Sequence, residues 1–308
     1  MRPLPERESE PLVSLAEITE IELLFLKSVR SLIPGEHRSQ SEGTGFDFVG
    51  LRDWQAGDRF SSIDWAQSSL TNFSPLVVRE FDQSAASNVV AVTDRSASTR
   101  CGIDGRSIAS LHAHAIATIG LSAVFFQDAF GLISFDAGFT ALEAVAPRVG
   151  KKQVLRCLGA YQDRRGTQEL RWAESLSATL RGFMRRTSLV PFVSDFLFTN
   201  PRAVLGELAR LNATHDVFVV LIDAAFAFAL PPVSAGWIQV ADVETGEARL
   251  VSRGELARLE RRVREWQHEV ERLIKDVGLD VVRIGADARQ SDLALAEFVA
   301  ERRMRKAR

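Results

Sequence analysis

Short apolar runs alternate with longer segments of helical periodicity along most of this chain. The apolar runs are rich in β-branched or aromatic residues and have the length of buried strands. They cover residues 89–93, 130–135, 189–193, 217–222 and 281–284. Helical patterns cover residues 107–126, 151–161, 170–184 and 201–211. A repeated strand-then-helix order is typical of a parallel sheet with helices on both faces. The pattern therefore predicts a doubly wound, mostly parallel α/β domain.

Three further patterns complete this domain. Residues 142–145 have the character of a short edge strand, and residues 237–243 and 248–251 that of a hairpin. Behind a capping box formed by Ser252 and Glu255, apolar residues then repeat at alternating steps of three and four. This helix either joins a coiled coil or covers the sheet. We favour the second interpretation because the repeat extends over only about three heptads.

The segment before residue 87 has a different texture. Ser14 and Glu17 form another capping box, which predicts an amphipathic helix that ends near Pro34. Glycines, aromatics and charges then alternate, and residues 76–81 form a further extended segment, so we expect short strands joined by turns. We predict an N-terminal helix and β-rich module at residues 1–86 and the α/β domain at residues 87–308.

Composition restricts the classes of partner. A net charge of -2 gives no field that would draw the protein to nucleic acid or to an anionic membrane. Cys101 and Cys157 lack the spacing of a zinc site or a disulfide framework. Residues 1–11 lack the apolar core of a secretory signal. The most apolar stretch, residues 217–230, contains Asp223 and is shorter than the roughly 20 residues of a membrane helix. We expect a cytoplasmic protein without a membrane span.

Oxygen-bearing side chains lie where ligands bind to open parallel sheets, beyond the carboxyl ends of the strands. Asp94, Ser96 and Ser98 follow the first predicted strand on alternate residues of a tight turn. Asp195 directly follows a later strand, and Thr167 lies between two predicted helices. Mg²⁺ prefers oxygen ligands in an octahedral array and keeps positions open for outside ligands. We therefore predict a Mg²⁺ or Mn²⁺ site formed by Asp94, Ser96, Ser98, Thr167 and Asp195.

This arrangement resembles the metal-ion-dependent adhesion site of von Willebrand factor A domains, in which an acidic residue of the ligand protein completes the coordination. The upstream segment is more specific. Gly45-Phe-Asp-Phe-Val-Gly-Leu-Arg-Asp-Trp-Gln-Ala-Gly-Asp58, with Ile63-Asp64-Trp65 and Val78-Arg-Glu-Phe81, resembles the signature of the bacterial family called domain of unknown function 58. In that family the signature precedes a von Willebrand A-like domain. The resemblance covers roughly residues 36–251.

The resemblance implies an adaptor or chaperone component that works with a MoxR-type AAA+ ATPase and other von Willebrand A-type proteins. Its role would be to assemble or activate another protein complex, as in one system that serves methanol oxidation. Ser61 and Ser62 stand where the family usually has basic residues, which puts an anionic contact there in doubt. Thr99 stands where methionine is common, and we expect a metal site to tolerate it because that position is not a ligand.

Other interpretations of the Asp94 loop stay open. An ordinary turn and helix cap would leave a metal-free scaffold. An enzyme would use Asp94 in metal-dependent phosphoryl transfer or Ser96 as the nucleophile of a hydrolase. The sequence has no GxxxxGK[ST] phosphate cradle, no GxSxG elbow and no second aspartate of an Asp-x-Asp phosphatase. We therefore expect recognition of a partner and not catalysis.

The remaining ionisable groups receive structural interpretations. His112 and His114 are two residues apart on a predicted helix, so they face different sides and do not chelate together. Asp58 is expected to pair locally with Arg52 or Arg59. The basic tail at residues 302–308 is expected to be a solvated helix end favoured by the helix dipole.

Overall fold

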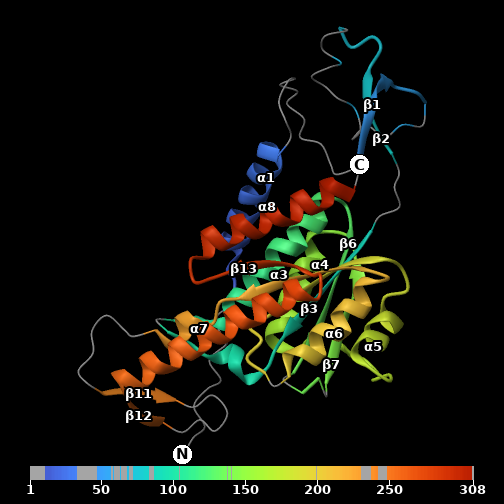
Figure 1. Ribbon diagram of the computed structural model, residues 1–308. Helices are drawn as coiled ribbons and strands as arrows, with labels where there is room; N and C mark the ends of the chain where they lie inside the picture. The colour runs from blue at the N-terminus through green and yellow to red at the C-terminus, as the bar shows by residue number, and fades with distance from the viewer. Residues whose placement is uncertain are drawn as a thin grey trace, which may run out of the picture.

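The computed structural model describes most of the chain. The described residues are 11–32, 47–56, 58, 63, 68, 72–82, 87–103, 105–136, 138–139, 141–198, 200–229, 237–241 and 248–306. At the centre is a seven-stranded sheet (Figure 1). Its parallel strands run in the order β13 (Asp280–Ile284), β10 (Asp216–Ile222), β9 (Ser188–Ser194), β3 (Asn88–Asp94) and β6 (Ala129–Phe135). The antiparallel strands β7 (Leu142–Arg148) and β8 (Gln168–Glu169) complete it. The predicted mostly parallel α/β sheet is confirmed.

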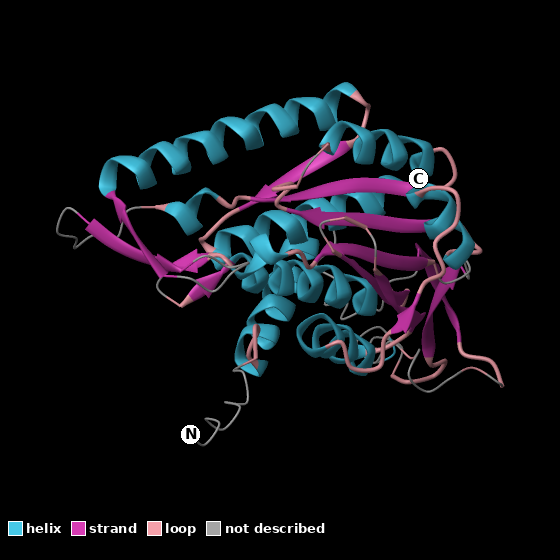
Figure 2. Ribbon diagram, turned by 90° about the horizontal axis from the view of Figure 1, so that it is seen from below, coloured by secondary structure: helices cyan, strands magenta, loops and turns pink. Residues whose placement is uncertain are grey.

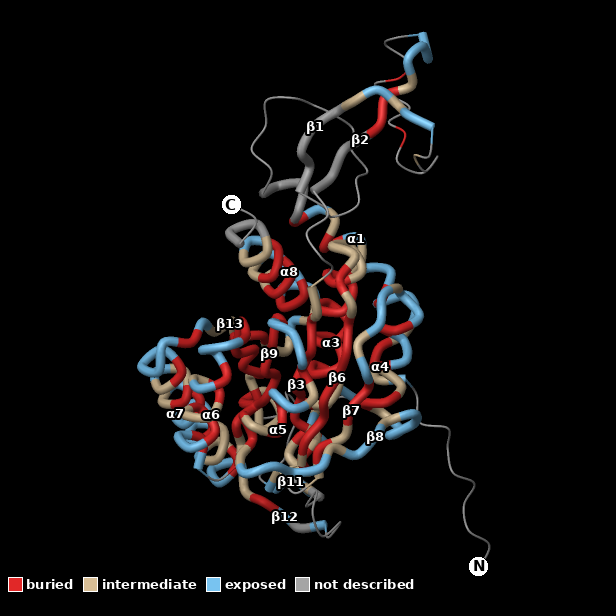
Figure 3. The backbone as a smooth tube through the Cα atoms, turned by 90° about the vertical axis from the view of Figure 1, so that its right-hand side faces the viewer, coloured by how far each residue is buried: buried red, intermediate tan, exposed pale blue. Residues whose placement is uncertain are grey.

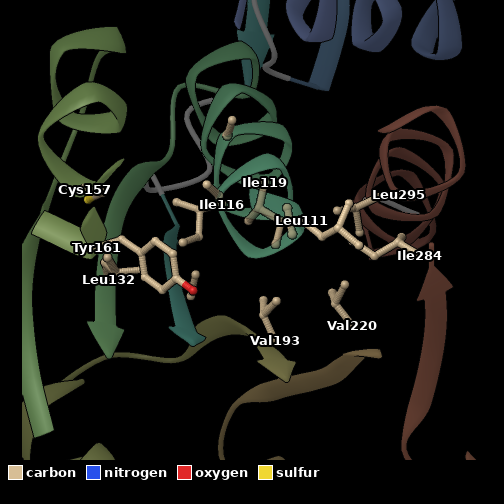
Figure 4. Packing of buried hydrophobic residues seen from close by; sticks show 14 of the residues in the cluster. Leu111, Ile116, Ile119, Leu132, Cys157, Tyr161, Val193, Val220, Ile284 and Leu295 are labelled. Atoms are coloured by element: carbon tan, nitrogen blue, oxygen red, sulfur yellow. The ribbon is translucent and has the colours of Figure 1, made fainter. Parts of the chain in front are cut away.

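Helices cover both faces of this sheet (Figure 2). On β3, Val89 and Ala91 face one apolar layer while Val90 and Val92 face the other, as the period of two along a strand requires. The first layer is completed mainly by α3 (Ile108–Phe125), α4 (Lys151–Asp163) and α8 (Ala288–Lys306). The second is completed by α5 (Leu176–Phe183), α6 (Pro201–Asn212) and the end of α7 (Arg253–Asp276). Figure 4 shows the first layer, with Tyr161 beside Leu132 on one flank and Leu295 beside Ile284 on the other.

Helix α3 lies at the centre of the first layer and is buried on nearly all sides (Figure 3). It packs against α4, α8 and the N-terminal helix α1 (Leu15–Leu32). By length and composition alone α3 is apolar enough to cross a membrane. In the protein, 78% of its residues are buried. A helix that is apolar all round is also what a position in the middle of a protein core requires.

Antiparallel pairs lie outside the central sheet. The first is β1 (Asp47–Asp53) with β2 (Val77–Asp82), and the predicted later hairpin is β11 (Trp237–Ala241) with β12 (Ala248–Ser252). A short pair, β4 (Gly102–Ile103) with β5 (Arg106–Ser107), leads into α3. The 3-10 helices η2 (Ala97–Arg100) and η3 (Ala225–Phe228) follow β3 and β10. Residues 45–46, 57, 59–62 and 64–65 of the Gly45–Trp65 signature lie outside the described residues, and the division at residue 86 stays a prediction.

Several sequence predictions need correction. The helix expected over residues 170–184 begins only at Leu176, because Ser175 caps it through the backbone N–H of Ala178. The strand expected over residues 142–145 is longer and has β8 beyond it, so it is not the edge of the sheet. Helix α8 was not predicted as a whole.

The basic tail is not simply solvated, which corrects another prediction. Arg302 pairs with Asp216 and Asp280 and lies over the ring of Phe218, and its side chain is only 14% exposed. Arg303 pairs with Asp128. These arginines therefore anchor α8 to the loops at the amino ends of the strands. The expected local pairing upstream is confirmed, since Arg52 binds both carboxylate oxygens of Asp58 at 2.7 and 2.8 Å.

Candidate metal-binding site

The candidate site lies at the carboxyl ends of β3 and β9, which are neighbours in the sheet. From β3 the chain passes through α3 to β6 on one side, and from β9 it passes through α6 to β10 on the other. The strand order therefore reverses between β3 and β9. Open α/β sheets bind ligands in the crevice at such a point, because the two loops diverge there and leave backbone and side-chain groups accessible.

Asp94 ends β3 and is completely buried. Its Oδ1 accepts a hydrogen bond from the backbone N–H of Ser96 at 2.8 Å, and its Oδ2 accepts one from Oγ of Ser194 at 2.9 Å. Its backbone oxygen accepts a third from the hydroxyl of Tyr161 at 3.2 Å. Since Ser194 ends β9, Asp94 connects the two strands that border the crevice.

Asp195 lies directly after β9 and is also completely buried. Its Oδ2 accepts a hydrogen bond from Oγ of Ser98 at 3.0 Å, and its Oδ1 accepts one from the backbone N–H of Leu197 at 2.9 Å. Oγ of Ser98 is 2.9 Å from Oγ of Ser96. The predicted proximity of Asp94, Ser96, Ser98 and Asp195 is thus what the structure shows, with Ser98 as the half-buried member.

The two carboxylates share a buried site without a basic partner among the described residues. The neighbouring Arg95 turns instead to Glu143, with Nη1 3.6 Å from a carboxylate oxygen. Burial raises the pKa of Asp94. Burial and the nearby charge of Asp94 together raise the pKa of Asp195 to about 7. Two adjacent buried carboxylates favour retaining a proton unless a cation neutralises them. Among the described residues, no positive charge offsets the two carboxylates at this site.

Thr167, the fifth predicted ligand, does not join this cluster through any hydrogen bond. Its hydroxyl donates to the backbone oxygen of Arg164 at 3.0 Å and to Oε2 of Glu143 at 3.4 Å. It lies immediately before β8, which β6 and β7 separate from β3. The residues brought together are therefore Asp94, Ser96, Ser98 and Asp195.

Residues that sequence reasoning passed over support the cluster. The side chain of Gln267 on α7 is fully buried: its Nε2 donates to the backbone oxygens of Asp195 at 3.0 Å and Ile222 at 2.7 Å, and its Oε1 accepts from the backbone N–H of Ala224 at 3.1 Å. Gln267 is a polar residue on the apolar stripe of α7, and this exception to the pattern could have identified it from the sequence. Tyr161 is the chain's single tyrosine, and this could have drawn attention to it.

A buried histidine borders the cluster without contributing a charge. Nδ1 of His112 lies 3.0 Å from Oγ1 of Thr93, and the ring stacks on Tyr161 with centroids 6.1 Å apart. Burial lowers the pKa of His112 to about 3, so the ring is neutral. His114, on another side of α3, contacts Asp292 instead, which confirms that the two histidines do not chelate together.

The donor set fits a hard cation. Among the described residues, no group of three or more His, Cys, Asp and Glu side chains is placed to hold a metal, so a zinc-type site has no support. The cluster offers two carboxylates and the hydroxyls of Ser96 and Ser98, all oxygen donors, which is the ligand chemistry of Mg²⁺. The missing positive charge at Asp94 and Asp195 is what such an ion would supply.

Comparisons with known proteins identify the family. An uncharacterized protein of Mycobacterium bovis and one of Mycobacterium tuberculosis are each 25% identical over 296 residues, which cover 94% of this chain and 89% of theirs. An aerotolerance-related membrane protein from Bacteroides fragilis matches 70% of this chain and 100% of its own at 11% identity, with a TM-score of 0.42. The PilB minor pilin of Streptococcus sanguinis matches 76% and 65% at 8% identity, with a TM-score of 0.39. Residues 50–271 match the family described as "Protein of unknown function DUF58", and the chain belongs to that family.

Proposed function

We propose that this protein is a metal-dependent protein interaction module. Asp94, Ser96 and Ser98 hold Mg²⁺ or Mn²⁺, Asp195 completes the inner or second shell, and a carboxylate of a partner protein closes the coordination. One observation carries the proposal: Asp94 and Asp195 are buried side by side with no basic partner among the described residues, at the carboxyl edge of the sheet. A divalent cation offsets this repulsion and leaves coordination positions for an outside acid.

The hydroxyl groups favour cation binding over a purely structural role. Ser96 precedes η2, yet its side chain makes no cap hydrogen bond to that helix. Its Oγ points instead to Oγ of Ser98, which connects it to Asp195. Ordinary capping would use the serine oxygen on a backbone N–H. The hydroxyls are therefore grouped around the carboxylates, as in the adhesion site of von Willebrand A domains that the sequence resembles.

The proposed role is recognition and not turnover. The family resemblance points to a MoxR-type AAA+ ATPase and to other von Willebrand A-type proteins as partners, with this chain as an adaptor or chaperone component in assembling another complex. ATP-driven motion of the ATPase would make or break the contact between the partner's carboxylate and the cation. The enzymatic alternatives have no observation that favours them, and turnover of generic phosphate or ester substrates would revive them.

Titration calorimetry with Mg²⁺ and Mn²⁺ tests the site. We expect saturable binding to the wild type and none to Asp94→Ala, with circular dichroism showing that the variant is folded. Asp163→Ala is the control, because it removes a carboxylate at the end of α4 whose ion pair, among the described residues, is with Arg165 and which lies outside the cluster. Absence of binding to the folded wild type contradicts an autonomous cation site and favours the metal-free scaffold.

A pull-down with a purified MoxR-type ATPase tests the partner. We expect the ATPase to be retained by immobilised wild type in Mg²⁺ and released by EDTA, and not to be retained by Asp94→Ala. Retention that EDTA leaves unchanged would mean that the contact does not pass through the cation.

A further inference from the structure

Helix α7 extends well beyond the edge of the sheet that carries the candidate site. Gln267 touches the backbone oxygens of Asp195 and Ile222, so it marks where α7 crosses that edge. The helix begins at Arg253, and at about 1.5 Å per residue its first half reaches about 20 Å farther out. The hairpin β11–β12 lies at this outer end, since Trp237 pairs with Ser252, the cap of α7 (Figure 1).

One row of side chains follows α7 from this outer end to the candidate site. Arg258, Arg262 and Trp266 are spaced four residues apart, so they are neighbours along the helix surface. We call them the docking ridge. They lie away from the buried stripe of Leu256, Val263, Gln267, Val270 and Ile274. Nε1 of Trp266 donates to the backbone oxygen of Phe196 at 2.9 Å, in the loop that begins with Asp195. The ridge therefore ends beside the cluster.

The ridge carries two positive charges that are not paired with acidic side chains of the described residues. Arg258 and Arg262 are exposed and form no ion pair with any residue that the structure describes. Arg264, by contrast, pairs with Glu260 on the same helix at 2.6 Å. Exposed arginines in a row favour carboxylates, which they bind through paired hydrogen bonds.

An apolar face lies at the outer end of the ridge. Trp237 is 65% exposed and Leu250 is 67% exposed. Trp237 lies opposite Ser252 and Leu250 opposite Gln239, so both side chains are on the same face of the hairpin. The opposite face carries Val251, which is buried. Exposed aromatic and aliphatic side chains grouped in this way are typical of contact surfaces between proteins.

We propose that an acidic, extended segment of a partner protein docks on this arm. An apolar residue of the segment packs on Trp237 and Leu250, its carboxylates pair with Arg258 and Arg262, and its next acidic residue reaches the cation held by Asp94. At about 3.3 Å per residue, about four residues span the roughly 12 Å from Arg258 to Trp266, and about six span the roughly 20 Å from the start of α7 to Gln267. The inference rests on the proposed function, because it names the chemistry of the partner that completes the same site.

Charge favours a polypeptide over a nucleic acid as the occupant. The outer half of α7 mixes signs: the glutamates at 255, 260 and 265 alternate with the arginines at 253, 258, 261, 262 and 264, and Glu260 pairs with Arg264, so a continuous phosphate backbone would meet repulsion along part of its path. A polypeptide that alternates acidic and apolar residues can place its carboxylates at the arginines alone.

Fluorescence anisotropy tests the proposal with a short fluorescein-labelled peptide of glutamate and leucine, in buffer with Mg²⁺. We expect Arg258→Glu with Arg262→Glu to weaken binding by about tenfold or more, because like charges then face each other. Trp237→Ala should also weaken it. The control is Arg185→Glu with Arg186→Glu, which makes the same change in charge on exposed residues before β9, at the opposite edge of the sheet. This control should bind like the wild type.

The outcomes separate this inference from the proposed function. Loss of peptide binding in the ridge variant, with Mg²⁺ titration unchanged, supports docking on α7. Peptide binding that Asp94→Ala abolishes but the ridge variant keeps overturns the docking ridge and leaves the cation site. Peptide binding that persists in EDTA but is lost in the ridge variant supports docking on the ridge. It contradicts a contact between the peptide and the cation. Failure of the peptide to bind, or tighter binding of a labelled single-stranded oligonucleotide, overturns the inference.

Discussion

Oγ of Ser98 donates a hydrogen bond to Oδ2 of Asp195 at 3.0 Å, although the two residues are far apart in the sequence. This contact joins the loop after β3 to the loop after β9 and brings together two carboxylates that repel each other. A cation bound by Asp94 and Asp195 would replace the Ser96–Ser98–Asp195 hydrogen bonds with coordination bonds. We therefore expect the repulsion between the two carboxylates to lower the free energy of unfolding of the metal-free protein.

Asp195→Asn should stabilise the metal-free protein above about pH 7. The folded state raises the pKa of Asp195 to about 7, above its ordinary 3.8, so it favours the protonated form. Stability then falls as the pH rises from about 4 to about 7, and the amide removes this loss. The amide can also keep the hydrogen bonds to Leu197 and Ser98. We expect a gain of about 1 kcal/mol or more in urea unfolding at about pH 8.

The same variant should lose its response to metal. Mg²⁺ at about a hundred times its Kd raises the stability of the wild type by about 2.7 kcal/mol, and it should leave Asp195→Asn unchanged. Asp216→Asn is the control with the opposite sign, because it removes the buried partner of Arg302 and should cost about 3 kcal/mol. A destabilised Asp195→Asn would show that the carboxylate serves the fold and not a cation.

Ser98→Ala and Thr167→Ala should separate ligands from bystanders. Ser98 contacts Asp195, so its loss should weaken Mg²⁺ binding by about tenfold or more in calorimetry. Thr167 contacts Arg164 and Glu143 instead, so its variant should bind Mg²⁺ within about twofold of the wild type. Equal losses in both variants would place Thr167 in the site after all.

His114 should make the packing of the N-terminal helix depend on pH. Its Nδ1 is 3.1 Å from Oδ2 of Asp292 on α8, and its Nε2 is 3.6 Å from Oε1 of Glu17 on α1. Burial lowers the pKa of His114, but the hydrogen bond to Asp292 and the charges of Asp292 and Glu17 outweigh this effect and raise it. The stabilisation is therefore complete below the ordinary pKa of about 6.5 and is lost as the pH rises through the folded value.

His114→Gln should consequently cost more stability at about pH 6 than at about pH 9. Urea unfolding of both proteins at the two pH values measures the difference. His268→Gln, at an exposed position of α7, is the control for the change of side chain. A cost that is the same at both pH values would mean that His114 contributes by packing alone.

The sheet and most of the site were predictable because both follow from short-range patterns. Val89 to Val92 are apolar on both faces, as a strand between two helical layers requires. Parallel strands end at one edge, so Asp94 and Asp195 were expected to meet there once their strands were recognised. Only their adjacency depended on strand order, which the sequence pattern leaves open.

The failures come from contacts that a linear pattern does not contain. Thr167 was assigned to the site from its loop, and this assignment stays a prediction, but in the structure its hydroxyl contacts Arg164 and Glu143 and the chain continues from it into β8. Arg302 was expected in solvent, but Asp216 and Asp280 pair with it from two neighbouring strands. For Arg302 both partners are distant in sequence, and no local spacing indicates them.

Gln267 is the sharpest example, and it gives the last prediction. Its side chain satisfies three buried backbone groups, at Asp195, Ile222 and Ala224. Gln267→Met keeps the volume but leaves these groups without a partner, so we expect a loss of about 2–4 kcal/mol in urea unfolding and weaker Mg²⁺ binding, because the Asp195 loop loses its support.

A charged replacement sharpens the test. In Gln267→Glu a carboxylate oxygen takes the place of Nε2 and faces the carbonyl oxygens of Asp195 and Ile222. The stability that this variant loses should therefore increase as the pH rises. Gln290→Met, at an exposed position of α8, controls for the change in side chain and should stay within about 0.5 kcal/mol of the wild type. If Gln267→Met were equally mild, the backbone groups would have found other partners, and the link from α7 to the cation site would not hold.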